Sequence, residues 1–343
     1  MSGSPVPAPP GSLDEQIAWH FGDPLREQRH LIEGAAAVDL SNRGVVTVTG
    51  VDRLSWLHSL TTQQLDPLPE EGSALALILS PHGHVEHELH LADDGTTTWI
   101  ITPPGTAAGL VDHLRSMQFM LRVEVADRSD DFAVVWEPVR EVAADAVTWL
   151  VPADFAGTGH VDAGADRGGD ARRYVPERPD VLVGREVIVP RADLADRMDR
   201  WPRQAGSWAL EALRVAAAVP RLGAETDHRT LPHEVGWIGP GVHLAKGCYR
   251  GQEAVARVHN LGHPPRRLVL LHLDGSQEQL PAHGDAVVVD GREVGWIGTS
   301  AWHHELGPIA TAVVKRSAPN EGVTFVRTAE GDLPATVEPV VES

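Results

Sequence analysis

The only cysteine of the chain lies in a glycine-bracketed octapeptide, KGCYRGQE, at residues 246–253. The two glycines allow backbone conformations that a Cβ would forbid. Residues from Gln252 to about Val258 favour a helix, which places Cys248 in the loop just before a helix N-terminus. There the helix dipole and the nearby Lys246 would favour the thiolate over the thiol. The alternative is that Cys248 is a small buried hydrophobic residue, as free cysteines commonly are.

A second stretch that could carry chemistry is HGHVEHELH at residues 82–90, with four histidines. Side chains alternate along a strand, so one face would hold His84, Glu86, Glu88 and His90. This face is expected to be solvated rather than to bind a metal. His87 falls on the other face among apolar neighbours, where the simplest interpretation is a histidine of the core.

The elements that position these residues follow from periodicity and turn signals. A β-branched run predicts a strand at 44–49, and apolar residues at helical spacing predict a helix from about Arg53 to Thr61, with Asp52 as its N-cap. Turn residues separate three further strand-like runs, which indicates an antiparallel meander. These runs are 73–79, 84–91 and 96–102.

The rest of the chain alternates helices and strands before it becomes rich in strands. Helices are predicted at 106–121 and about 208–219, strand-like runs at 123–151, and a polar surface loop at 162–173. From residue 268 onward strands dominate, and Asp290-Gly291 is a strong hairpin signal. The sequence therefore predicts an α+β protein with a C-terminal all-β domain.

Composition limits the partners. The chain has 343 residues and a formal net charge of −19, which argues against a nucleic-acid partner. The longest aliphatic run, 74–79, falls far short of the roughly 20 residues that span a bilayer, so no membrane partner is expected. A single cysteine permits no intramolecular disulfide, and the N-terminus through Gly11 reads as a disordered tail without a secretion signal. We expect a cytoplasmic protein.

The octapeptide closely resembles the signature K-G-C-[YF]-x-G-Q-E of the YgfZ branch of the glycine-cleavage T-protein (GcvT-like) superfamily. This branch comprises folate-binding proteins linked to iron–sulfur cluster assembly and repair. Other stretches are similar to the family as well, so the resemblance extends over roughly residues 34–318. They are GVDRLSWLHSLTTQ, LRVAAAVPRLGAETDHRTLPHEVG and VGWIGTSAWHHELGPIA.

The resemblance implies a three-part ring: a ferredoxin-like subdomain, an interwoven second α+β subdomain and a C-terminal β-barrel. The corresponding boundaries are a leading segment at 1–30, a folate-binding region at 31–262 and a barrel with a short tail at 263–343. It further implies an accessory factor that binds tetrahydrofolate or a related reduced folate and acts on iron–sulfur client or assembly proteins. The alternative is a folate-dependent one-carbon transferase.

The resemblance also assigns residues. Cys248 would be the reactive or cluster-contacting thiol, and the folate would lie in a central cavity bordered by His87, the octapeptide and Arg257. The octapeptide positions concerned are Lys246, Gly247, Tyr249, Gly251, Gln252 and Glu253. No metal ligands are predicted. Arg257 either pairs with Glu253 along an exposed helix face or meets the acidic tail of the folate.

Two positions depart from the aminomethyl-transferring T-proteins. Their motif GGI[IL]DDLIV places a catalytic aspartate at the position of His87, so that carboxylate is absent here and aminomethyl transfer is not expected. Their pattern LRLEAG places a pterin-contacting glutamate at the position of Ala216. A scaffold that has lost ligand binding is a third interpretation.

Overall fold

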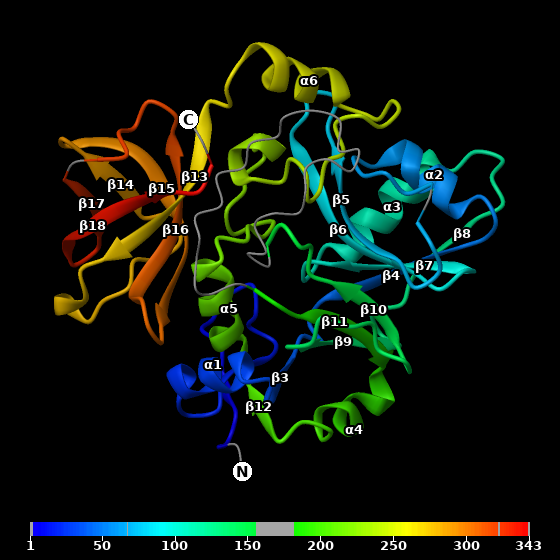
Figure 1. Cartoon of the computed structure of the whole chain (residues 1–343), viewed down its shortest axis with the longest axis horizontal. Coiled ribbons are helices and arrows are strands. Elements are labelled where there is room, and N and C mark those ends of the chain that lie inside the picture. The colour runs from blue at the N-terminus through cyan, green and yellow to red at the C-terminus, as the bar shows by residue number, and fades with distance from the viewer. Residues whose placement is uncertain (1–2, 67, 156–181, 322, 342–343) are drawn as a thin grey trace.

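The computed structural model describes residues 3–66, 68–155, 182–321 and 323–341, and three sheets make up most of it. Two five-stranded sheets and a closed barrel surround a centre that is occupied by a helix and the loop after it (Figure 1). The architecture is α+β with three main parts, as the resemblance implies. The predicted loop at 162–173 lies outside the described residues.

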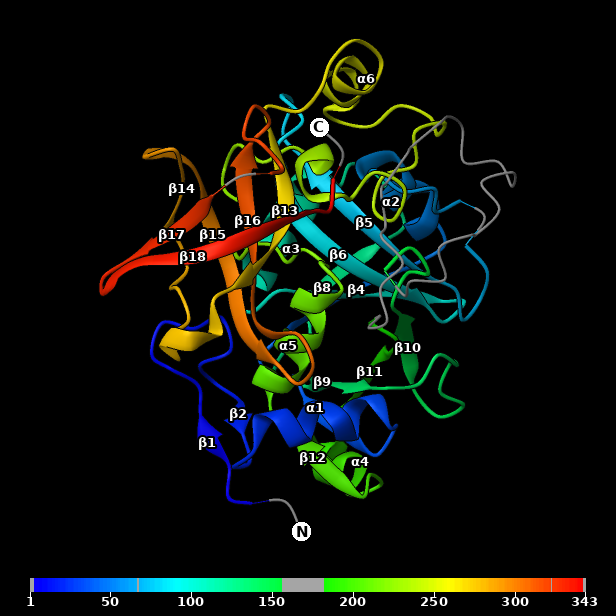
Figure 2. The same ribbon diagram turned by 60° about the vertical axis from the view of Figure 1, so that its left-hand side comes forward.

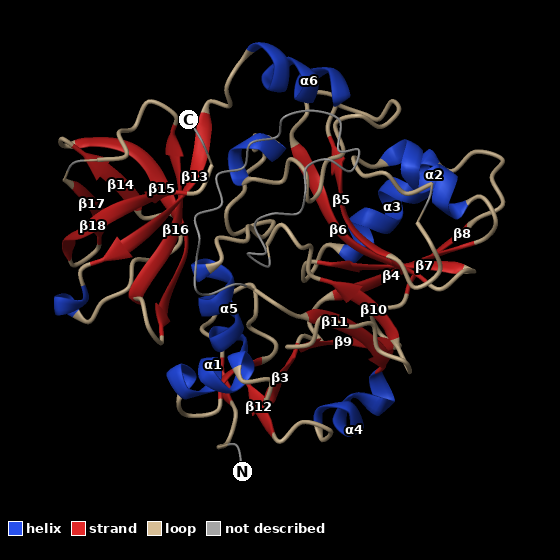
Figure 3. Cartoon of the chain, viewed as in Figure 1, coloured by secondary structure: helices blue, strands red, loops and turns tan. Residues whose placement is uncertain are grey.

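The first sheet has the order β5-β6-β7-β4-β8 and contains the predicted meander. Its strands are β4 (Gly44–Thr49), β5 (Ser73–Leu79), β6 (Val85–Asp93), β7 (Thr97–Thr102) and β8 (Glu124–Asp127). Helices α2 (Arg53–Leu60) and α3 (Ala107–Met117) cover its outer face (Figure 3). Their apolar residues pack with Ile78, Leu89 and Ile100 in one buried cluster. Asp52 does not cap α2 with its side chain, because its carboxylate accepts hydrogen bonds from Arg122 instead.

The second sheet has the order β10-β11-β9-β3-β12 and is interwoven with the first. The chain forms β3 (Ala36–Asp39), crosses to the first sheet for β4 to β8, and then returns for the other strands. These are β9 (Phe132–Glu137), β10 (Val147–Leu150), β11 (Arg185–Pro190) and β12 (Arg203–Ala205). The helices beside it are α1 (Pro24–Ile32), η1 (Arg191–Asp193), α4 (Leu194–Met198) and α5 (Ser207–Ala216).

The C-terminal strands close a barrel in the order β13-β16-β15-β14-β17-β18. They are β13 (Arg266–Leu273), β14 (Ala286–Val289), β15 (Arg292–His303), β16 (Gly307–Lys315), β17 (Thr324–Thr328) and β18 (Gly331–Pro339), with η3 (Gly275–Gln277) in the loop after β13. The hairpin signal is confirmed, since Asp290 and Gly291 both have positive φ between β14 and β15. The barrel stands beside α5 (Figure 2).

Two short elements connect these parts. η2 (Pro232–Val235) and α6 (Gln252–Leu261) contact each other, and α6 precedes the barrel in the chain. The N-terminal segment corrects the expectation of a disordered tail from residue 3 onward. There β1 (Val6–Pro7) pairs with β2 (Ala18–His20), and Ala8 is buried.

Candidate functional site

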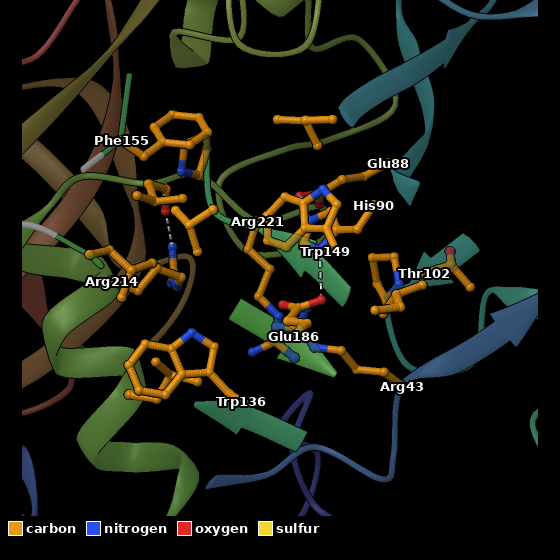
Figure 4. A pocket seen from close by; sticks show the side chains of 18 of the residues that line it. Arg43, Glu88, His90, Thr102, Trp136, Trp149, Phe155, Glu186, Arg214 and Arg221 are labelled. Atoms are coloured by element: carbon orange, nitrogen blue, oxygen red, sulfur yellow. Dashed lines mark hydrogen bonds and ion pairs between the residues drawn. The ribbon is translucent and has the colours of Figure 1, made fainter. Parts of the chain in front are cut away.

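A central cavity lies between the two five-stranded sheets and α5 (Figure 4). The space free of atoms is about 710 Å³ when the open solvent at its mouth is included, and the centre of a water-sized sphere can occupy about 60 Å³ of it. Aromatic side chains and charged groups both form its wall. The aromatic residues are Trp136, Trp149, Phe155 and Trp237, and the charged or titratable residues are Arg43, Glu88, His90, Glu186, Glu211, Arg214 and Arg221.

One part of the wall is a chain of alternating charges built on β6 and β11. The His90 Nδ1 atom lies 2.8 Å from Glu186 Oε2, and its Nε2 atom lies 3.3 Å from Glu88 Oε1. Arg43 donates to the other oxygen of Glu186, and Leu222 donates its backbone N–H to Glu88 Oε2 at 2.7 Å. Burial opposes ionisation of Glu186, but Arg43 and His90 outweigh it and keep the pKa of Glu186 below its usual range.

The opposite part of the wall is tied to the barrel through Arg214 of α5. Its guanidinium contacts Glu211 and the fully buried Glu225, each at 3.0 Å, and donates to Thr299 Oγ1 at 2.6 Å. A Cβ at Gly298 would lie 2.9 Å from Glu225. Gly298 and Thr299, which lie in the stretch VGWIGTSAWHHELGPIA, therefore make room for this carboxylate and bind it, since the Thr299 hydroxyl donates to Glu225 at 2.7 Å.

Arg221 contacts Asp14 at 2.7 Å and Glu211 of the second part of the wall at 3.3 Å. Its charge also interacts with Glu186 and Glu88 of the first part. Because each buried carboxylate here faces an arginine or His90, the charges compensate one another inside the protein.

The predicted faces of β6 need correction. Glu88 and His90 do not lie on a solvated face: both line the cavity, and Glu88 is only 5% exposed. Of that predicted face, Glu86 alone in β6 is exposed. The second sheet and α5 cover this side of the sheet, so Glu88 and His90 line a cavity and not the outer surface.

His87 does not border the cavity, so the expectation that it does is wrong. Strand alternation is the reason: His87 lies on the face of β6 opposite to Glu88 and His90, and pairs with Ile78 on the side that α2 and α3 cover. A β-bulge at Glu86 affects only the residues before it, because Leu79 pairs with Val85 and Ile78 with His87. His87 therefore points toward α3, where its ring lies 5.7 Å from that of His113. Burial, with a smaller contribution from His113, lowers the pKa of His87 to about 4.

The octapeptide docks on the turn that leads into β6. Gly251 has φ +82°, and a Cβ there would lie 2.5 Å from the Ser80 carbonyl oxygen. Gly83 of the same turn lies against Ala254 of α6, and a Cβ added at Gly83 would lie 2.8 Å from the Ala254 Cβ. Only glycines allow this contact between the loop and the turn. By contrast, a Cβ at Gly247 would meet no atom within 4 Å.

Lys246 anchors the start of the octapeptide to α2. Its buried ammonium donates to the backbone carbonyls of His58 and Thr61, at the C-terminal end of that helix. It also lies 5.3 Å from the centre of the Tyr249 ring. Burial lowers the pKa of Lys246 to about 8 and raises that of Tyr249 to about 12.

Cys248 is exposed and lies in the loop before α6, as predicted. The interpretation of Cys248 as a buried hydrophobic residue is therefore wrong. Gln252 begins α6, and its side-chain amide lies within 3.4 Å of the carbonyls of Lys246 and Gly247. Arg250 pairs with Glu86 at 3.1 Å, which is a second contact between the octapeptide and β6.

Arg257 pairs with Glu253 at 3.0 Å on the exposed face of α6. Neither residue, nor any other member of the octapeptide, lines the central cavity. The structure thus separates the predicted site into a cavity and a surface loop, which are connected through β6. Ala216 also lies outside the cavity wall, buried with Leu268, Ile309 and other residues between α5 and the barrel.

The charged cavity residues were not predicted as a site, although the sequence carries a signal for some of them. Glu211 and Arg214 are three residues apart in an otherwise apolar helix, SWALEALRVA, a pattern that indicates a buried ion pair. Glu186 likewise interrupts the apolar strand REVIVP. Nothing in the sequence brings these residues to His90, because the contacts span 96 residues or more.

Two further searches were restricted to the described ranges. They contain no group of three or more histidine, cysteine or acidic side chains arranged to hold a metal ion. Within the same ranges, no helix combines the length and apolar character that a membrane crossing requires.

Comparison with known proteins gives three kinds of match. Residues 266–341 match the glycine cleavage T-protein C-terminal barrel domain. The chain is 26% identical to an aminomethyltransferase of Nostoc sp., over 87% of this chain and 82% of that protein. It is 25% identical to the tRNA-modifying protein YgfZ of Yersinia enterocolitica, over 72% and 73% of the two chains.

The remaining matches concern a fungal relative and a solved structure. The chain is 24% identical to an iron–sulfur cluster assembly factor IBA57 homologue of Aspergillus fumigatus, over 73% of this chain and 60% of that protein. The aminomethyltransferase T structure from Bartonella henselae superposes with a TM-score of 0.73, at 16% identity over 97% and 92% of the two chains. This likeness shows the fold. The resemblance that the octapeptide predicts is confirmed: the chain has a GcvT-like fold and is similar in sequence to proteins of the YgfZ branch.

Proposed function

We propose that the chain is a reduced-folate-binding accessory factor for iron–sulfur proteins, with the folate in the central cavity and Cys248 as the reactive surface thiol. The observation that carries the proposal is the path of β6. Its leading turn holds the octapeptide through Gly83 and Gly251, while its middle residues Glu88 and His90 line the cavity. One strand therefore connects a ligand in the cavity with the loop that presents the thiol.

The cavity wall has the chemistry that a reduced folate requires. Trp136, Trp149 and Phe155 offer aromatic surface to a planar ring, and Glu88 retains acceptor capacity for ring N–H groups. Trp237 lines the cavity, and its indole N–H has no hydrogen-bond acceptor among the described residues. A buried donor of this kind is stabilised when a ligand or water supplies an acceptor.

The exposed position of Cys248 supports a role toward another protein. One thiolate cannot hold an iron–sulfur cluster alone, so a cluster at Cys248 would need further ligands from a client, a second copy or a small thiol. The names of the YgfZ and iron–sulfur assembly relatives favour this partner class. The absence of a nucleic-acid partner stays a prediction, since one of these relatives is named a tRNA-modifying protein.

Calorimetric titration with tetrahydrofolate and its 5-formyl form tests the cavity. We expect binding by the native protein, weaker binding by Glu88→Gln, and unchanged binding by the control Glu338→Gln, whose residue pairs with His272 in the barrel. The proposal fails if millimolar folate produces no heat. Client [4Fe–4S] enzyme activity in cells that lack this protein tests the thiol, and restoration by Cys248→Ser equal to that by the native protein would contradict its role.

A second candidate is the folate-dependent one-carbon transferase, and the placement of Glu88 favours it. The argument against transfer was the missing carboxylate at His87, but His87 faces away from the cavity and Glu88 faces into it. Formation of methylene-tetrahydrofolate from tetrahydrofolate and an aminomethylated lipoyl carrier tests this function. Turnover that Glu88→Gln abolishes would favour the transferase, and no turnover at saturating folate would exclude it.

A further inference from the structure

His90 is the one ring in the cavity wall that faces carboxylates with both of its nitrogens. Its Nδ1 and Nε2 atoms lie 2.8 and 3.3 Å from oxygens of Glu186 and Glu88. An ionised carboxylate only accepts hydrogen bonds, and a neutral imidazole has a single N–H to donate. Both contacts are hydrogen bonds only when both ring nitrogens carry a proton, which is the imidazolium form.

Each of the two carboxylates has one oxygen that accepts from a fixed donor and one that faces His90. Arg43 donates to Glu186 Oε1, and the Leu222 backbone N–H donates to Glu88 Oε2 at 2.7 Å. The oxygens left for His90 are Glu186 Oε2 and Glu88 Oε1. A donor on the second oxygen of a carboxylate stabilises its charged form, which favours placing the proton of each contact on the ring.

Every element around His90 contributes to this balance. Two carboxylates lie beside the ring: Glu88 comes from the same strand, β6, and Glu186 comes from β11. Two arginines complete the group. Arg43 comes from the segment before β4, and Arg221, which pairs with Asp14 and Glu211, comes from the segment after α5. The neighbouring strands β5 and β7 place the apolar Leu75 and Ile101 beside it, and β10 places Trp149. Burial lowers the pKa of His90, but the charges and hydrogen bonds of Glu186 and Glu88 outweigh it and raise that pKa above its usual value.

Trp149 fixes the ring in this position. The indole and imidazole planes are 8° apart with their centroids separated by 3.7 Å, and the indole N–H donates to the Ala74 carbonyl at 3.0 Å. A cationic ring stacked on tryptophan is stabilised by the π system. Rotation of His90 away from either carboxylate would break this stack, so the ring is held between them.

We propose that His90 is a positioning residue which, as an imidazolium, holds the Glu88 carboxylate toward the cavity and balances its charge when an anionic or acceptor-rich heteroaromatic ligand binds. The inference rests on the proposed function for the identity of the ligand as a reduced folate. With the proton in place, Arg43 and His90 balance Glu88 and Glu186. Without it, the group carries one net negative charge, Glu88 loses a hydrogen bond, and an anionic ligand is repelled.

Nitrogen-15 NMR of the histidine rings tests the charge without any ligand, with His90→Gln used to assign the signal. We expect both nitrogens of His90 to be protonated at pH 6.5 and to titrate with a midpoint above the ordinary histidine value. A single neutral tautomer at this pH would overturn the inference. If His90→Gln does not fold, the pH dependence of Trp149 fluorescence, taken as native protein minus Trp149→Phe, reports the same titration.

Titration with tetrahydrofolate across pH then tests the positioning role. If only the protonated cavity binds, the apparent Kd rises about tenfold one pH unit above the His90 midpoint. His90→Gln is expected to bind tetrahydrofolate more weakly, and its Kd should not rise at alkaline pH. The control His272→Gln, in the barrel, should show the same rise of Kd as the native protein. If the Kd of His90→Gln still rises at alkaline pH, the positioning role of His90 is contradicted. Absence of folate binding at every pH, with the imidazolium present, would instead overturn the proposed function.

Discussion

Gly251 provides the sharpest test of how the octapeptide is held, because a methyl group there conflicts with the turn before β6. Its φ of +82° is left-handed, a conformation that costs an alanine about 1–2 kcal/mol relative to glycine. The added Cβ would also lie 2.5 Å from the Ser80 carbonyl oxygen and 3.1 Å from the Gly83 Cα. Both neighbours are backbone atoms, so the loop has to move, and overpacking of this kind costs about 1–3 kcal/mol.

We therefore expect Gly251→Ala to lower the free energy of unfolding by about 2–5 kcal/mol, or to undock the loop locally. Gly247→Ala is the matched control in the same octapeptide: its Cβ would meet nothing within 4 Å, so a change within about 0.5 kcal/mol is expected. Urea unfolding measures the global effect, and the rate of tryptic cleavage after Arg257 of α6 measures local opening. The reasoning is refuted if Gly251→Ala matches the native protein in both assays, or if the two alanine variants behave alike.

Three further predictions follow from the site. Cys248→Ser should change the stability by less than about 0.5 kcal/mol, because the thiol is exposed, and urea unfolding checks this. Lys246→Met removes two charge-assisted hydrogen bonds to the end of α2 and should destabilise by about 2–4 kcal/mol in the same assay; an unchanged midpoint would contradict the anchor. His87, His233 and His303 each have a pKa lowered to about 4, chiefly by burial, so the unfolded chain binds more protons between pH 6.5 and 4. Stability should fall as the pH drops through this window, by up to about 3 kcal/mol per histidine, and a flat profile between pH 7 and 5 would refute this.

Local sequence patterns predict the individual elements of this fold well. The strands at 44–49 and 73–79 have the predicted bounds, and the helix predicted from 53 to 61 ends one residue earlier. In each case the deciding interactions are short in sequence: β-branched runs, apolar residues at helical spacing and turn residues. The exposed cysteine loop before α6 is predicted by the helix signal that follows it, whereas its docking depends on distant contacts of Gly251 with the turn before β6 and of Lys246 with the end of α2.

The same patterns cannot assign the faces of β6. Alternation separates the polar from the apolar face, but a polar face can meet solvent or a charged cavity. The difference depends on Glu186 and Arg221, which approach His90 and Glu88 only through the folding of the second sheet and the segment after α5. The bulge at Glu86 adds a second uncertainty, because one extra residue moves the side chains that precede it in β6 to the opposite face of the sheet.

The faces on which these residues lie change how the chain compares with the aminomethyl-transferring T-proteins. The sequence comparison placed the two differences at His87 and Ala216, yet His87 packs toward α3 and Ala216 packs between α5 and the barrel. An acidic side chain introduced at either position would therefore point away from the cavity. The residue whose substitution tests the proposed folate binding against the proposed one-carbon transfer is therefore Glu88, whose carboxylate already lies in the wall. Since His90 holds that carboxylate and neutralises its charge, the reactivity of Glu88 depends on whether His90 keeps its proton once a ligand excludes water from the cavity.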